Sequence, residues 1–200
     1  MLYIFTRGLT LSKVIGITGK AGAGKDTVAA IIKAYLHAYG HKAKRYSFAD
    51  PLKRGCAELF GIPVEEFYDR DLKDTPHPVW GVSRRSLLIM VGTDHLRDQF
   101  DQEIWIKRAN QELSKNESSN TFTIVPDVRF DNEAHFVTDV GGVLFNVVRD
   151  ERLRDVPDID HKSEAGVDLT NAITIDNNCS FRKLTHQVHI LMDRVLLNVE

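Results

Sequence analysis

The stretch GKAGAGKDT at positions 19–27 carries the strongest chemical signal in this sequence. It fits the pattern G-x-x-x-x-G-K, in which glycines let the backbone fold closely around phosphate oxygens. Successive backbone N–H groups and the start of the following helix supply partial positive charge there. The ammonium group of Lys25 would contact the outer phosphates and follow the charge as a phosphoryl group is transferred. The stretch predicts a phosphate-binding loop (the P-loop, residues 19–27), and the alternative is an ordinary glycine-rich turn.

Asp26 stands where this pattern normally has serine or threonine, and Thr27 follows it. A carboxylate at a helix N-terminus is favourable in itself, so Asp26 could serve the helix alone. Beside a triphosphate, however, a bare carboxylate is repelled. We therefore expect Asp26 to face a Mg²⁺ ion, directly or through water, with Thr27 near the phosphates.

Basic residues outside the P-loop could bind an anionic phosphoryl acceptor, which brings roughly two negative charges. Lys53 and the pair Arg84 and Arg85 fall in the first turns of predicted helices, where a cation opposes the helix dipole unless an anion binds. Arg70 lies in a polar loop, and Arg129 follows a predicted strand. Taken alone, each is better explained as a solvated surface charge. Their shared placement at helix starts and strand exits favours an acceptor site.

Three further residues have both a functional and a structural interpretation. Trp105 could stack on a base, or it could fill the core at helical spacing. Asp127 at a strand exit could face Mg²⁺ or the acceptor, or it could cap a turn. Asn177 lies in a polar turn at positions 176–178, which could read the adenine edge or simply cap the last helix.

Strands and helices that would position these residues alternate along the chain. Short apolar runs predict strands at 14–18, 43–48, 121–125, 143–148 and 172–175. Helical periodicity and end signals predict helices at 26–39, 50–61, 83–92, 105–113, 132–140 and 180–199. Asp50 and Ser83 are the expected N-caps of the second and third. The alternation predicts a three-layer α/β/α fold of the P-loop kinase type, with a parallel five-stranded sheet and sites at its carboxyl edge.

The composition favours a cytosolic protein without long nucleic acid or membrane as a partner. The net charge is −2, so no global positive field is available to hold a polynucleotide. No apolar run approaches the roughly 20 residues of a membrane span. The two cysteines, Cys56 and Cys179, are too few for a disulfide framework, and we expect both to be reduced and buried.

The domain organisation follows from the length of 200 residues, 42% of them hydrophobic, which suits one substantial core. We expect an N-terminal extension at 1–13 and a single domain at 14–200. Polar insertions near 63–82 and 149–168 could close over reactants and exclude water. The sequence leaves the oligomeric state open between a monomer and a homodimer.

Five stretches in this order resemble the phage deoxynucleoside monophosphate kinases. They are the P-loop ending in GKDT, FADPLK at 48–53, SRRSLLIMVGTD at 83–94, IVPDVR at 124–129 and HKSEAGV at 161–167. The P-loop alone says little about the substrate, whereas the ordered set is specific. Ala21 departs from the resemblance, because some members have a polar residue there, and the residues before position 14 lie outside it.

This resemblance implies transfer of the γ-phosphoryl group of ATP to a deoxynucleoside monophosphate (dNMP), with Mg²⁺, in the cytoplasm of a host cell if the gene is viral. With the resemblance, the residues predict an ATP site of Gly22, Ala23, Gly24, Lys25, Asp26, Thr27 and Asn177. They predict a dNMP site of Lys53, Arg70, Arg84, Arg85, Trp105, Asp127 and Arg129. Catalytic roles would belong to Lys25, Arg85 and Arg129, and Mg²⁺ would lie near Asp26 and Asp127.

Three other functions remain open at this point. Another small-molecule kinase, such as a dephospho-coenzyme A kinase, would phosphorylate a hydroxyl group and could use Asp127 as a base. A regulatory GTPase is disfavoured, because the sequence has no N-K-x-D base-reading motif. A non-catalytic ATP-binding module would consume ATP slowly, whatever monophosphate is added.

Overall fold

The computed structural model describes residues 13–114, 121–153 and 166–197. Positions 1–12 of the predicted extension, most of the predicted insertion at 149–168 and the start of HKSEAGV lie outside the described residues. The chain divides into two compact units: Met1–Arg45 with Asn120–Glu200 (unit 1), and Tyr46–Ser119 (unit 2). The single domain at 14–200 stays a prediction.

Unit 1 is built on one five-stranded sheet in which all neighbouring strands are parallel, in the order β2-β3-β1-β4-β5. The strands are β1 (Val14–Thr18), β2 (Lys42–Arg45), β3 (Thr121–Val125), β4 (Val143–Val148) and β5 (Ala172–Asp176). The helices are α1 (Lys25–Ala38), α5 (Asp131–Asp139), the short 3₁₀ turn η3 (Glu151–Leu153) and α6 (Phe181–Leu197). The predicted parallel five-stranded sheet is confirmed, although its second strand ends at Arg45 and does not reach position 48.

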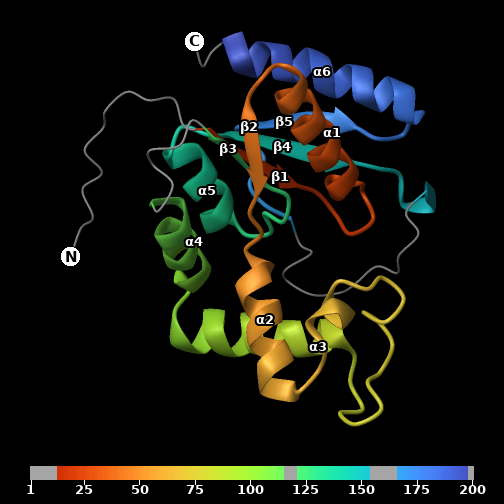
Figure 1. The fold of residues 1–200 in the computed structure, drawn as a ribbon, viewed down its shortest axis with the longest axis vertical. Coiled ribbons are helices and arrows are strands. Elements are labelled where there is room, and N and C mark those ends of the chain that lie inside the picture. The colour runs from red at the N-terminus through yellow and green to blue at the C-terminus, as the bar shows by residue number, and fades with distance from the viewer. Residues whose placement is uncertain (1–12, 115–120, 154–165, 198–200) are drawn as a thin grey trace. The chain divides into compact units, whose positions relative to one another are not determined.

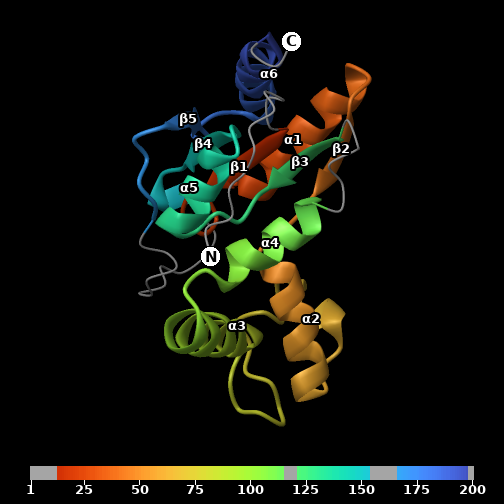
Figure 2. The same ribbon diagram turned by 90° about the vertical axis from the view of Figure 1, so that its left-hand side faces the viewer.

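Side chains of β1 alternate between the two faces of this sheet, because successive strand residues point to opposite sides. Ile15 and Ile17 belong to the main core, together with apolar residues of α1 and α6. Gly16 faces the other way, since a Cβ there would lie 2.9 Å from Cγ2 of Val137 on α5. Helices therefore cover both faces, and the predicted three-layer arrangement is confirmed (Figure 1, Figure 2).

The carboxyl ends of the strands determine where the chemistry of unit 1 can lie. In a parallel sheet all strands end at the same edge, where ligands bind in folds of this kind. Residues that follow β1, β3, β4 and β5 are the P-loop, Asp127, Arg149 and Asn177 in turn. The site predicted at this edge can therefore be formed by the segments that follow these four strands.

Unit 2 is mainly helical. Its elements are α2 (Ala49–Phe60), the 3₁₀ turn η1 (Val64–Phe67), α3 (Arg84–Ile89), the π-helical segment η2 (Met90–Phe100) and α4 (Ile104–Ser114). Ser83 caps α3 as predicted, because its Oγ accepts a hydrogen bond from the backbone N of Ser86 at 3.1 Å. The prediction of Asp50 as a cap is wrong. The helix has already begun at Ala49, and Asp50 instead accepts a hydrogen bond from the Tyr68 hydroxyl at 2.8 Å.

Gly92 does not end a helix, which is a second correction. The chain continues from α3 through η2 as far as Phe100. A Cβ at position 92 would lie 2.2 Å from Cδ2 of Leu52 on α2. Glycine is therefore needed there for the close approach of two helical segments and not as a stop signal.

Cys56 and Cys179 differ in exposure. Cys56 is buried in unit 2 as expected, whereas Cys179 is exposed at the start of α6, so the prediction of two buried thiols is wrong for the second. Both thiols are free. Among the described residues, no helix is long and apolar enough to cross a membrane.

Candidate active site

The P-loop connects the end of β1 to the start of α1. Gly19, Gly22 and Gly24 have φ angles of 136°, 73° and 98°, which residues with a Cβ rarely adopt. A Cβ on Gly19 would also lie 2.3 Å from the carbonyl oxygen of Val147 on β4. These glycines are required by the backbone itself, as expected for a loop that folds closely around an anion.

The start of α1 lacks a side-chain cap. Gly24 is its N-cap residue, and it has no side chain that could accept from the first N–H groups of the helix. The ammonium group of Lys25 folds back over the loop, where it donates to the carbonyl oxygens of Gly19 and, at 2.9 Å, of Lys20. Backbone donors, the helix dipole and one ammonium group thus gather on a single short loop.

Asp26 has a partner that sequence reasoning missed. Its Oδ1 lies 2.7 Å from Nη2 of Arg45, at the end of β2. Both side chains are more than half exposed, so this ion pair contributes little to stability. Thr27 is likewise exposed. Arg45 could have been found only from the pairing of β2 with β3, which brings its strand end to the same edge of the sheet.

The exit of β3 carries Asp127 and Arg129. The backbone N of Val128 donates to the carbonyl oxygen of Ile17 at 3.2 Å, which ties this exit to the end of β1. Glu133 is buried, and its carboxylate accepts hydrogen bonds from the backbone N of Arg129 at 2.8 Å and of Phe130 at 3.3 Å. Glu133 therefore fixes the backbone that presents Asp127 and Arg129, a role that its position three residues into α5 could have suggested.

Asn177 follows β5, and its side-chain amide reaches the P-loop. Nδ2 donates to the carbonyl oxygen of Ala23 at 2.8 Å. The predicted contact with an adenine edge stays a prediction. What the structure brings together in unit 1 is the P-loop, Asp127, Arg129 and Asn177, all beyond the carboxyl ends of the strands.

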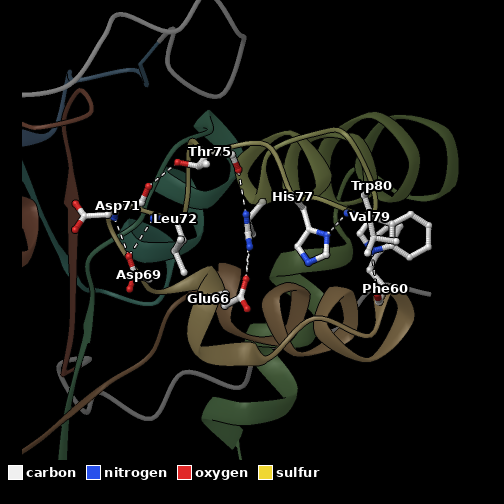
Figure 3. Close-up of polar contacts among 10 residues, drawn as sticks. Phe60, Glu66, Asp69, Asp71, Leu72, Thr75, His77, Val79 and Trp80 are labelled. Atoms are coloured by element: carbon white, nitrogen blue, oxygen red, sulfur yellow. Dashed lines mark hydrogen bonds and ion pairs between the residues drawn. The ribbon is translucent and has the colours of Figure 1, made fainter.

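Arg84 lies in unit 2 and is buried at the base of the loop 63–82. Its guanidinium group contacts both the Glu66 carboxylate and the backbone of Thr75. Its Nε donates to Oε2 of Glu66 at 3.1 Å, and its Nη1 donates to the carbonyl oxygen of Thr75 at 3.0 Å. This loop contains the turn η1 and further internal bonds, among them those from the backbone N of Asp71 and of Leu72 to Oδ1 of Asp69 (Figure 3).

Arg85 next to it pairs with Asp74. The Nη2 of Arg85 lies 3.0 Å from Oδ2 of Asp74, and its Nε contacts Oδ1. The hydrogen bond from Arg85 is the main reason why the pKa of Asp74 lies below its ordinary value. Asp74 remains 46% exposed, so this pair can exchange partners with a solvent anion more readily than Arg84 can.

The other predicted acceptor residues also have contacts inside unit 2. Nζ of Lys53 lies 3.9 Å from the centroid of the Tyr68 ring. The indole N–H of Trp105 donates to the carbonyl oxygen of Gly92 at 3.1 Å, which fits the structural interpretation of that residue. Arg70 is exposed. Their contact with a nucleotide stays a prediction.

Fold and site together define a class, that of the P-loop nucleotide-binding proteins: a glycine loop with its lysine connects a strand to a helix at the carboxyl edge of a parallel sheet. Sequence comparison identifies the family. The pattern of the deoxynucleotide monophosphate kinase family matches residues 72–188, more than half of the 200 residues. This chain belongs to that family and is thus a kinase.

Three relatives show the same similarity. A protein of Acanthamoeba polyphaga mimivirus, described as a deoxynucleotide monophosphate kinase, is 35% identical over 152 residues, which cover 68% of this chain and 74% of that one. The deoxynucleoside-5'-monophosphate kinase of Escherichia phage T5 is 24% identical over an alignment that covers 78% of this chain and 86% of that one. The deoxynucleotide monophosphate kinase of Enterobacteria phage T4 is 31% identical over 112 residues, which cover 54% and 44%. The resemblance predicted from the sequence is confirmed.

Proposed function

We propose that this chain transfers the γ-phosphoryl group of ATP to a deoxynucleoside monophosphate, giving ADP and a deoxynucleoside diphosphate for DNA synthesis. The observation that carries the proposal is the P-loop: its glycines adopt left-handed conformations, and Lys25 lies over it at the uncapped start of α1. Membership of the deoxynucleotide monophosphate kinase family supports the choice of acceptor. The viral relatives support a role in the cytoplasm of an infected cell.

The chemistry requires positioning and charge neutralisation more than covalent catalysis. The acceptor oxygen of a dNMP is already anionic, so no general base has to remove a proton. In this proposal the P-loop N–H groups, from Gly22 to Thr27, hold the β- and γ-phosphates, and the ammonium group of Lys25 moves from loop carbonyls to the phosphate oxygens. Arg129, held by Glu133 through its backbone, would neutralise charge that develops on the transferring group.

Mg²⁺ is part of the proposal, and the residues present fit it in one specific way. Among the described residues, no group of three or more acidic, histidine or cysteine side chains could hold a metal ion without help. Mg²⁺ in phosphoryl-transfer enzymes is instead held by one or two carboxylates together with phosphate oxygens. Asp26 and Asp127 could supply those carboxylates, with the Thr27 hydroxyl group nearby. Bound with ATP, the ion would neutralise charge on the outer phosphates.

On the strength of the family resemblance, we propose roles in acceptor binding for Lys53, Arg70, Arg85 and Trp105. For the same reason we propose such roles, each residue considered by itself, for Asp127 and Arg129. Arg84 is proposed only as a support for them, because Glu66 and Thr75 already engage its guanidinium group.

A coupled assay that measures ADP formation with dGMP, dTMP, AMP and dephospho-coenzyme A as acceptors tests the proposed reaction. We expect turnover with deoxynucleoside monophosphates. Turnover with dephospho-coenzyme A alone would overturn the proposal, as would slow ATP hydrolysis that no acceptor stimulates.

Lys25→Ala tests the assigned site, with Lys33→Ala as the matched control, because Lys33 lies exposed on the same helix. Removing the P-loop ammonium group should lower kcat/KM by about 10²-fold or more without loss of helical circular dichroism. The control should keep wild-type kcat/KM. Near wild-type activity of Lys25→Ala would refute the assignment of the P-loop.

A further inference from the structure

The turn that follows β5 makes a direct contact with the P-loop, although about 150 residues separate the two in the chain. The side chain of Asn177 donates from Nδ2 to the carbonyl oxygen of Ala23 at 2.8 Å. The fit is close, because a Cβ on Gly24 would lie 2.3 Å from the same nitrogen atom. Ala23 is buried, so its carbonyl group has little access to water as a substitute donor.

This turn is itself held by the end of β4. The backbone N of Asn177 donates to the carbonyl oxygen of Val148 at 2.9 Å. Oδ1 of Asn178 accepts a hydrogen bond from the backbone N of Asp150 at 2.7 Å. The backbone N of Asn178 donates to Oδ1 of Asp176 at 2.9 Å. The amide group of Asn177 is therefore not a mobile surface group, since the backbone that carries it is fixed on both sides.

We propose that Asn177 is a positioning residue that holds the P-loop in its anion-binding conformation. In a planar trans peptide group the C=O and N–H bonds point in opposite directions. A donor that fixes the carbonyl of Ala23 on one side consequently directs the N–H of Gly24 to the other side, away from Asn177. That N–H belongs to the loop whose backbone donors are proposed to hold the phosphates of ATP. The inference rests on the proposed function only for the identity of the anion.

This role differs from the reading of adenine predicted for Asn177 from the sequence. The hydrogen bond to Ala23 uses one of the two N–H donors of the amide and directs the group toward the loop. If Asn177 acts through the loop, its loss must weaken binding of any ligand that carries a triphosphate, whatever the base. If it reads adenine, its loss must weaken binding of ATP and spare ligands without that base.

Direct binding measurements on the full chain separate these roles. We would compare Asn177→Leu, which removes the donor without adding charge, and Asn177→Asp, which keeps the shape of the side chain. Asn171→Asp is the matched control, because Asn171 is exposed just before β5, at the opposite end of the strand. Isothermal titration calorimetry would give Kd for ATP, for ITP and for inorganic tripolyphosphate in the absence of acceptor, and Kd for dGMP separately.

We expect both Asn177 variants to bind ATP, ITP and tripolyphosphate about tenfold more weakly, as for loss of one well-placed hydrogen bond and of loop order. The Kd for dGMP, and all values for Asn171→Asp, should stay at wild-type level. In turnover, KM for ATP should rise while KM for dGMP stays constant. A melting temperature without ligand would show that each variant is folded. If Asn177→Leu fails to fold, Asn177→Ala replaces it, because alanine also removes the donor without adding charge.

Several results would overturn the inference. A loss confined to ATP would assign Asn177 to the base, and a loss confined to Asn177→Asp would show charge repulsion in place of positioning. Unchanged affinities in both variants would show that the loop holds its shape without the amide. Failure of the proposed function is distinguishable, because a wild-type chain that phosphorylates no dNMP but binds tripolyphosphate still allows the comparison.

Discussion

The guanidinium group of Arg84 forms an ion pair with the carboxylate of Glu66, and it also donates to the backbone carbonyl of Thr75. Arg84 is only 4% exposed. One side chain in the first turn of α3 thus joins η1 to Thr75 in the loop 63–82, entirely within unit 2. A cation at a helix N-terminus opposes the helix dipole, and the pairing with Glu66 explains why it is tolerated here.

Arg84→Met should destabilise the protein by on the order of 3 kcal/mol, because it leaves the Glu66 carboxylate and the Thr75 carbonyl without their donor. Arg85→Met is the control. It breaks an ion pair whose carboxylate is 46% exposed, so the expected cost is below about 1 kcal/mol. Urea unfolding followed by circular dichroism measures both. Equal costs would show that the buried position of Arg84 has no special weight.

Asp74 makes the stability of the protein depend on acid pH. The hydrogen bond from Arg85 lowers its pKa in the folded state below the ordinary value of 3.8. A carboxyl group with a lowered folded pKa stabilises the protein fully above its unfolded pKa, and this contribution is lost as pH falls through the lower folded value. The stability difference between wild type and Asp74→Asn should therefore be constant above about pH 5 and shrink below pH 4.

Titration of the Asp74 carboxyl carbon by NMR checks the cause. In Arg85→Met the midpoint should move upward toward 3.8, since the largest contribution to the lowered pKa has been removed. An unchanged midpoint would assign the lowered pKa to another group. The energy at stake is below about 1 kcal/mol, because Asp74 is nearly half exposed.

The P-loop and its neighbours could be predicted because their signals are local. An apolar run, closely spaced glycines and a helical repeat of Val28, Ile31, Ile32, Tyr35 and Leu36 determine β1, the loop and α1 without information from elsewhere. The exits of the other strands follow from the rule that parallel strands end at one edge. This is why Asp127 and Asn177 could be selected from the sequence.

Contacts between distant segments could not be predicted in this way. Arg45 meets Asp26 only because β2 pairs with β3, and Asn177 meets Ala23 only because β5 lies two strands from β1. The helix predicted at 83–92 ends too early, and nothing in the sequence around Gly92 indicates the proximity of Leu52. In each case the missing information is the identity of a partner far away in the chain.

The two thiol groups should react at very different rates. Cys56 is 1% exposed, and burial raises its pKa to about 11, so almost none of it is the reactive thiolate at pH 8. Cys179 is exposed. With N-ethylmaleimide at pH 8, mass spectrometry of the native protein should show one addition, and none in Cys179→Ser. Both thiols should react in guanidinium chloride, and rapid double addition without denaturant would contradict the burial of Cys56.

Gly92 and Leu52 should show energetic coupling, because a Cβ at position 92 would lie 2.2 Å from the end of the Leu52 side chain. Gly92→Ala alone forces Leu52 out of its place and should cost about 1–3 kcal/mol. Leu52→Ala alone leaves a cavity beside the small core around Cys56 and Phe67, and it should cost about 2 kcal/mol or more.

The double variant Gly92→Ala/Leu52→Ala shows whether the two costs arise from steric crowding between positions 92 and 52 or independently of each other. Alanine at 92 occupies part of the space that Leu52→Ala vacates, so the double variant should be more stable than the sum of the single costs predicts, by about 1 kcal/mol. Gly55→Ala on α2 is the control, because a Cβ there would meet no atom within 4 Å. Additive costs for Gly92→Ala and Leu52→Ala would show that the close approach of α2 to η2 does not require glycine at position 92.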